Sequence, residues 1–161
     1  LWQMYMKNQE LNIQLPSLLL PAVIYTPVLD FSVNTVILQW IGPGDASLLG
    51  KVGQDITLEE AQKAAQKCIL NLLANLEAKI KDLNKIKRFV KILAFVASDD
   101  TFTQQPQVVN GGSQLLVDIF GDTIGKPARS AIGVNVLPGN IPVEIELLVE
   151  LKKGTEKETI G

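Results

Sequence analysis

Residues 127–151, PARSAIGVNVLPGNIPVEIELLVEL, constrain the fold more than any other part of the chain. Apolar residues alternate with polar or small ones on both sides of a Pro-Gly-Asn sequence at 138–140, which is typical of a turn. Because successive side chains of a strand point to opposite faces, each arm has one apolar face. The pattern predicts a two-stranded hairpin in which Val136 pairs with Val143.

Arg129 is the residue of this stretch best suited to bind a ligand. Its neighbours along the strand are small, which leaves space for an anion beside the guanidinium. In the predicted pairing it shares a face with Glu144 and lies opposite Glu150, so a structural ion pair with Glu150 is the alternative. The pattern by itself favours the ion pair.

The composition limits the kinds of reaction and binding site that the chain can form. The chain has 161 residues, 47% of them hydrophobic, and a net charge of −2, which indicate one globular domain with little attraction for nucleic acid or membrane surfaces. It has no histidine and a single cysteine, Cys68, which exclude histidine-dependent triads, intramolecular disulfides and thiolate zinc sites. We expect no metal, so any hydrolysis must use a carboxylate, backbone groups and positioned water.

Hydrophobic periodicity predicts the remaining elements. Thr57 and Glu60 form a capping box that begins a long helix, whose apolar stripe continues to Ile80. Four lysines between residues 79 and 87 favour a solvated helix end over a basic surface for ligands. We expect strands at 22–31, 34–41, 48–52 and 87–97, a second helix at 105–120 that ends at Gly121, and a short helix at 6–15.

Two features concern packing. The strand at 87–97 is apolar on both sides, which predicts helices on one side and another subunit on the other. Gly111 and Gly112 interrupt the second helix, either because a neighbour packs closely or because a ligand needs room. The order strand, strand, helix, strand, helix, strand, strand predicts a two-layer α+β domain with helices on one face of a mixed sheet.

Several phrases together resemble one family. They are GKVGQDITLEEAQ, FTQQPQVVNGG, PARSA, Leu-Pro and Val-Glu-Ile-Glu, and over about residues 22–152 the chain is similar to the RidA (YjgF/YER057c/UK114) family, in a longer-chain branch. The resemblance implies a chorismate-mutase-like fold that assembles as a homotrimer. It places the domain at 17–152, after an extension at 1–16 and before a polar tail at 153–161.

The same resemblance implies a reaction and a site. The reaction is hydrolysis of reactive 2-imino or enamine acids to 2-oxo acids with release of ammonia, and it needs no cofactor. Arg129 and the backbone amide of Ala131 would bind the substrate carboxylate, while Glu144 positions the attacking water, with Glu146 as a competitor for that role. Further matches to pocket-lining positions are Tyr25, Phe102 and Asn110.

One departure supports a second function. Gln39-Trp40-Ile41 stands where relatives have Ser-Gly-Gln, which puts an indole ring where the family has backbone access to the pocket. This favours a non-catalytic trimer that binds a small carboxylate or a partner protein. Endoribonuclease activity, a third reading that some relatives suggest, is disfavoured by the acidic pI of about 5.2 and the absence of an arginine-rich face.

The expected location is the cytoplasm, with mitochondria as the alternative. The apolar run at 17–25 is too short to span a bilayer and is interrupted by Pro21, so we expect no membrane partner.

Overall fold

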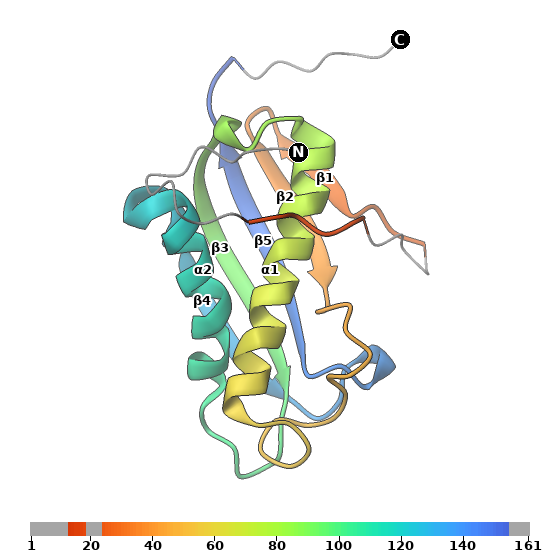
Figure 1. Ribbon diagram of the computed structural model, residues 1–161. Coiled ribbons are helices and arrows are strands. Elements are labelled where there is room, and N and C mark those ends of the chain that lie inside the picture. Colours follow the sequence, from red (N-terminus) through yellow and green to blue (C-terminus); the bar gives the residue numbers. More distant parts are fainter. Residues whose placement is uncertain (1–12, 19–23, 155–161) are drawn as a thin grey trace.

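Two α-helices cover one face of a five-stranded sheet in the computed structural model, which describes residues 13–18 and 24–154 (Figure 1). The elements are β1 (Val28–Ser32), β2 (Thr35–Ile41), α1 (Leu58–Ile80), β3 (Ile86–Ala97), α2 (Gln105–Gly125), β4 (Ala128–Val134) and β5 (Val143–Leu151), with short 3-10 turns at Leu83–Lys85 and Pro138–Asn140. The strand order is β1-β2-β5-β3-β4; among these described strands β3 and β4 are parallel and the other neighbouring pairs are antiparallel. This is the two-layer chorismate-mutase-like fold that the resemblance implied.

Helix α1 begins where the capping box predicted. The Thr57 side chain accepts a hydrogen bond from the Glu60 backbone, and the Glu60 carboxylate accepts one from the Thr57 backbone. The helix ends at Ile80 and is capped by Lys81, which has a left-handed φ of 67°. Lys85 donates to the carbonyl of Ile80 at this end, which agrees with the solvated helix end.

The two glycines of α2 allow close contact with α1. A Cβ at Gly111 would lie 2.3 Å from the backbone oxygen of Gln62, and one at Gly112 would lie 2.9 Å from Ile69. Close packing is therefore the reason for this pair. Gly121 has φ 75°, so the helix breaks at the predicted residue before one further turn.

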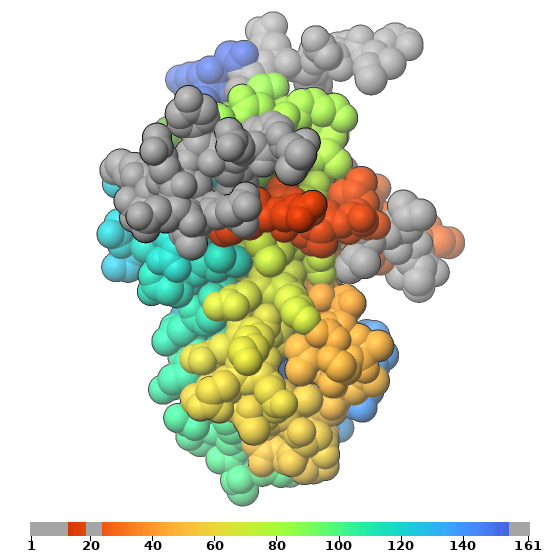
Figure 2. Space-filling view, viewed as in Figure 1, coloured from red at the N-terminus to blue at the C-terminus, as the bar shows by residue number. Residues whose placement is uncertain are grey.

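The N-terminal part differs from the sequence prediction. Of the strand predicted at 22–31, residues 24–27 are not in β1, which begins at Val28, and residues 22–23 lie outside the described residues. Residues 48–52 form no strand, and Val52 makes isolated bridges. Residues 13–18 have no regular secondary structure and lie across α1 (Figure 2), with Ile13 and Leu15 packed against the core. The rest of the helix predicted at 6–15 lies outside the described residues.

The predicted hairpin is wrong because β4 and β5 are not neighbours. β3 lies between them and pairs with β4 in parallel and with β5 in antiparallel orientation. The turn forms at the predicted place, but residues 135–142 cross the end of β3, a span of roughly 10 Å for two strand spacings. Alternation had grouped the residues that share a face of each strand, but it identified neither the partner of each strand nor the buried face of β4, where Ile132 is exposed and Ala131 packs against the core. The pairing of Val136 with Val143 does not occur.

The two faces of the sheet have different surroundings. Ile92, Ala94, Ile145 and Leu147 are fully buried beneath the helices. The opposite face, called the far face below, carries large apolar groups that are partly exposed in the single chain; Leu29 is 56%, Ile132 43% and Trp40 38% exposed. Among the described residues, no helix is long and apolar enough to cross a membrane.

Candidate functional site

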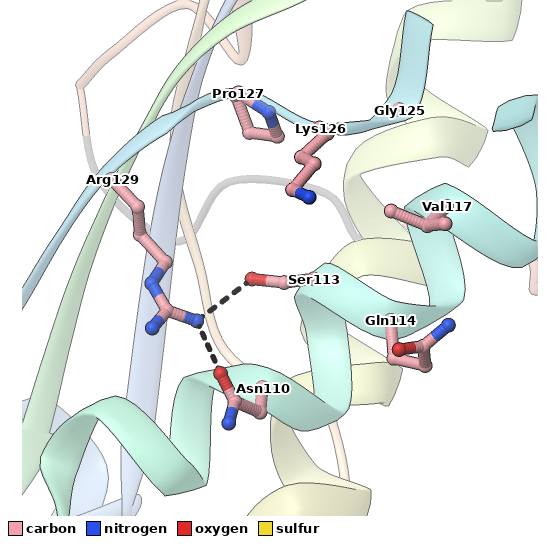
Figure 3. Close-up of a pocket in the computed structure, with 8 residues that line it drawn as sticks. All are labelled: Asn110, Ser113, Gln114, Val117, Gly125, Lys126, Pro127 and Arg129. Atoms are coloured by element: carbon pink, nitrogen blue, oxygen red, sulfur yellow. Dashed lines mark hydrogen bonds between the residues drawn. The ribbon is translucent and has the colours of Figure 1, made fainter. Parts of the chain in front are cut away.

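Arg129 lies on the helix side of β4, at the edge of the sheet. It aligns with Ile92 of β3, and its Nη1 donates to Asn110 Oδ1 at 2.8 Å and to Ser113 Oγ at 3.1 Å (Figure 3). The alternative ion pair with Glu150 is wrong, since that carboxylate binds Lys87 and Arg88 instead. The face that the sequence predicted for Arg129, shared with Glu144, is also wrong.

The guanidinium is held in place with most of its donors still available. Asn110 and Ser113 are three residues apart on α2, so they lie on one side of the helix, away from the glycines that contact α1. Both hydrogen bonds use Nη1, and Nε and Nη2 form none within the described part of the chain. No carboxylate there lies within ion-pair distance of Arg129. The Nε–Nη2 edge has the geometry that binds a carboxylate through two hydrogen bonds.

A cavity of about 380 Å³ adjoins this arginine. It is large enough for a small metabolite. Two cationic side chains and no acidic one are among the described residues that line it, which are Asn110, Ser113, Gln114, Val117, Gly125, Lys126, Pro127 and Arg129 (Figure 3). The cavity therefore favours an anionic ligand.

Two other predicted residues lie on the same side of the sheet as Arg129. Asn110 contacts it directly. Ala131 is two residues further along β4 on the same face and packs against the core. The structure therefore brings together Arg129, Asn110 and Ala131 at one edge of the sheet.

Glu144 lies on the far face. It aligns with Phe95 of β3, whereas Arg129 aligns with Ile92. Two strand spacings and three residues along the strand put the two Cα atoms about 14 Å apart, with side chains on opposite faces. The Glu144 carboxyl is half-buried, and this burial raises its pKa.

The two remaining predicted residues are also distant from Arg129. Tyr25 is partly exposed just before β1, at the opposite edge of the sheet from β4. Phe102 follows β3 and packs on the backbone of Gly53, where a Cβ would lie 2.9 Å from its ring. Neither lines the cavity beside Arg129.

Trp40 owes its position to a β-bulge. Gln39 and Trp40 lie in the interval where the register between β2 and β5 shifts. The Trp40 ring centroid is 4.6 Å from that of Phe95, and its Nε1 donates to Glu146 at 2.6 Å. Glu146 is therefore engaged by the indole, and Glu144 is the freer of the two carboxylates.

The sequence prediction missed Ser113, Gln114 and Lys126. Helical spacing could have identified Ser113, because it is three residues from Asn110 and must lie on the same side of the helix. Lys126 comes directly after α2, and nothing in the local pattern indicates that its side chain points into the cavity.

Comparisons with known proteins agree with this architecture. Residues 43–151 match the family model "Endoribonuclease L-PSP". Protein TCP17 of Trypanosoma cruzi is 36% identical over 145 residues, which are 89% of this chain and 91% of that protein. The crystal structure of Atu1372 from Agrobacterium tumefaciens, whose function is unknown, shares 36% identity with a TM-score of 0.78, covering 89% of this chain and 88% of that one.

A more distant structure shares the fold. The YjgF gene product of E. coli is 22% identical with a TM-score of 0.57, over 82% of this chain and 91% of that one. With the family model matched over most of the domain and a relative at 36% identity, the chain belongs to the endoribonuclease L-PSP family, also called the RidA/YjgF family.

Proposed function

We propose that this protein hydrolyses reactive 2-imino and enamine acids to 2-oxo acids and ammonia. The observation that carries the proposal is Arg129, which is tethered through one nitrogen by Asn110 and Ser113 and keeps its Nε–Nη2 edge for a carboxylate. All substrates of this class carry that carboxylate next to the reactive carbon. The family resemblance supplies the reaction class.

The reaction balances without a redox partner. The oxygen of water bonds to the carbon of the protonated C=N group, and one proton of that water passes to a base. The C–N bond of the resulting carbinolamine then breaks as its nitrogen accepts a proton and its hydroxyl group gives one up to the base, which leaves a 2-oxo acid and ammonia. Burial raises the pKa of Glu144, and a carboxyl whose pKa is shifted toward neutrality is suited to accept and return a proton.

We place the complete site between two subunits. Arg129 and Glu144 face opposite sides of one sheet, so a single small ligand cannot contact both within one chain. The apolar far face supports contact with a second copy of the chain, because large exposed apolar areas mark interfaces. Family members are typically homotrimers, and a trimer would bring the far face of one chain toward the Arg129 edge of its neighbour.

A second candidate is a trimer that binds carboxylates without turning them over. Trp40 supports it, because its ring packs against Phe95 and its Nε1 donates a hydrogen bond to Glu146, on the face that carries Glu144. RNA cleavage, which the family description names, has less support because only two arginines are present and the net charge is −2.

The test is a coupled assay in which 2-iminopropanoate is generated in situ. Arg129→Ala should lower kcat/KM by about 10- to 100-fold, the loss expected for a charge-assisted hydrogen bond to the carboxylate. Arg88→Ala is the matched control, because Arg88 is the only other arginine of the sequence and it binds Glu150 at the surface. Turnover in the wild type that survives Arg129→Ala would refute the anchor. Carboxylate binding without turnover in the wild type would favour the second candidate.

A further inference from the structure

The cavity beside Arg129 has more positive charge than one carboxylate requires. Arg129 and Lys126 both line it, and none of the described lining residues is acidic. Neither cation has a carboxylate of the described chain within ion-pair distance. Among the described residues, three lysines form ion pairs, which are Lys67 with Asp45, Lys79 with Asp30 and Lys87 with Glu150.

The position of Lys126 allows its amine to contact a ligand in the cavity. It lies between the end of α2 and Pro127, and its amine points into the cavity toward the side where Ser113 and Arg129 lie (Figure 3). Its charge also suits the C-terminal end of a helix, which is the structural alternative for a lysine here. That alternative does not require the side chain to enter the cavity.

The remaining lining fits an extended ligand with two polar ends. Ser113 accepts a hydrogen bond from Arg129, so its own hydroxyl proton is available to an acceptor in the cavity. Gln114 donates from its amide nitrogen to Asp118, and its carbonyl oxygen forms no hydrogen bond within the described residues. Val117 and Pro127 provide apolar surface for a short carbon chain.

We propose that Lys126 binds a second carboxylate and that the preferred ligands are dicarboxylates, namely 2-imino acids with an acidic side chain and the corresponding 2-oxo diacids. Arg129 takes the carboxylate next to the reactive carbon, and Lys126 takes the distal one. The choice of substrate rests on the proposed hydrolysis, whereas the binding preference does not.

Binding is therefore measured first, by calorimetry, with 2-oxoglutarate and 2-oxobutyrate as probes. The wild type should bind 2-oxoglutarate roughly tenfold more tightly, a gain between those of an exposed ion pair and a charge-assisted hydrogen bond. Lys126→Met keeps an unbranched side chain and removes the charge, so it should abolish this preference by lowering the affinity for 2-oxoglutarate much more than the affinity for 2-oxobutyrate. Lys63→Met, at an exposed position of α1, is the control.

Four results would overturn the subsite. They are equal wild-type affinities for the two probes, an equal loss of affinity for both probes in Lys126→Met, a preference that Lys126→Met retains, and competition by inorganic phosphate as strong as that by 2-oxoglutarate. A retained preference with lower stability is the result that a purely structural lysine predicts. If 2-oxoglutarate is preferred and imines are not hydrolysed, the subsite stands and the proposed reaction fails.

Discussion

Two glutamates on β5 show how one partner changes the chemistry of a residue. Glu144 and Glu146 both point to the far face, two positions apart. Trp40 donates to Glu146 and fixes it. Glu144 is affected by burial, which raises its pKa. From the sequence the two were interchangeable candidates, and only the bulge in β2 distinguishes them.

The raised pKa of Glu144 predicts how stability depends on pH. The folded state binds its proton more tightly than the unfolded state does, so its contribution is full below the unfolded pKa of about 4.3 and is lost as pH rises through the higher folded pKa. Glu144→Gln has no titrating carboxyl at this position, so its stability does not fall with pH for this reason. Urea unfolding between pH 4 and pH 8 should therefore show the variant gaining stability relative to the wild type as pH rises.

Glu150→Gln is the control of opposite sign. Hydrogen bonds from Lys87 and Arg88 lower the pKa of Glu150, so its contribution is present above the unfolded pKa and is lost as pH falls. This variant should lose stability relative to the wild type as pH rises. Parallel pH profiles for the two variants would contradict both assignments.

At the scale of elements, the contact between α1 and α2 depends on Gly111. Alanine in a helix normally adds about 1 kcal/mol of stability relative to glycine. Here its Cβ would lie 2.3 Å from the backbone oxygen of Gln62, so the helices must separate. We expect Gly111→Ala to lower the free energy of unfolding by about 1–3 kcal/mol, as for other overpacked sites.

Chemical denaturation with an unchanged m-value measures this loss. Gln107→Ala, at an exposed position of the same helix, is the control and should stay within about 0.5 kcal/mol of the wild type. An unchanged or higher midpoint for Gly111→Ala would show that the helices do not need this close approach.

The elements themselves were largely predictable, because their signals are local. The Thr57 cap, the stripe of α1, strand β3 and the break at Gly121 follow from neighbouring residues alone. The β3–α2–β4 crossover was not predictable from alternation, since a strand with an apolar face can pair with any suitable neighbour. The hairpin error followed from choosing the nearest strand in sequence.

The candidate site was predictable only in part, for a related reason. Arg129 and Asn110 came from the family resemblance, and the structure shows their direct contact. The separation of Arg129 from Glu144 by the sheet depends on register with β3, which neither strand encodes by itself. Lys126 lies in a connection without periodicity, where no local pattern gives the direction of a side chain.

For the whole molecule, the sheet separates two sets of candidate groups, which lie on its opposite faces. Arg129, Asn110 and Lys126 lie on the helix side near β4, and Glu144 and Trp40 lie on the far face. In a cyclic assembly each chain uses one surface toward one neighbour and a different surface toward the other. A ring of this kind can bring the far face of each chain to the arginine of the next.

This arrangement predicts that Arg129→Ala and Glu144→Ala chains complement each other. Each homotrimer should keep only a small residual activity, about a tenth or less of the wild-type kcat/KM, because every site lacks one of the two groups. After mixing in equal amounts and reassembly, a site is intact when an Arg129-bearing chain meets a Glu144-bearing neighbour, which random assembly in a ring gives for about a quarter of the sites. The mixture should therefore recover about a quarter of the wild-type rate. Sedimentation must show trimers, and mass-tagged chains must show exchange. No recovery in fully exchanged trimers would mean that the two residues never serve the same ligand, and that water is positioned by another group on the helix side of the sheet.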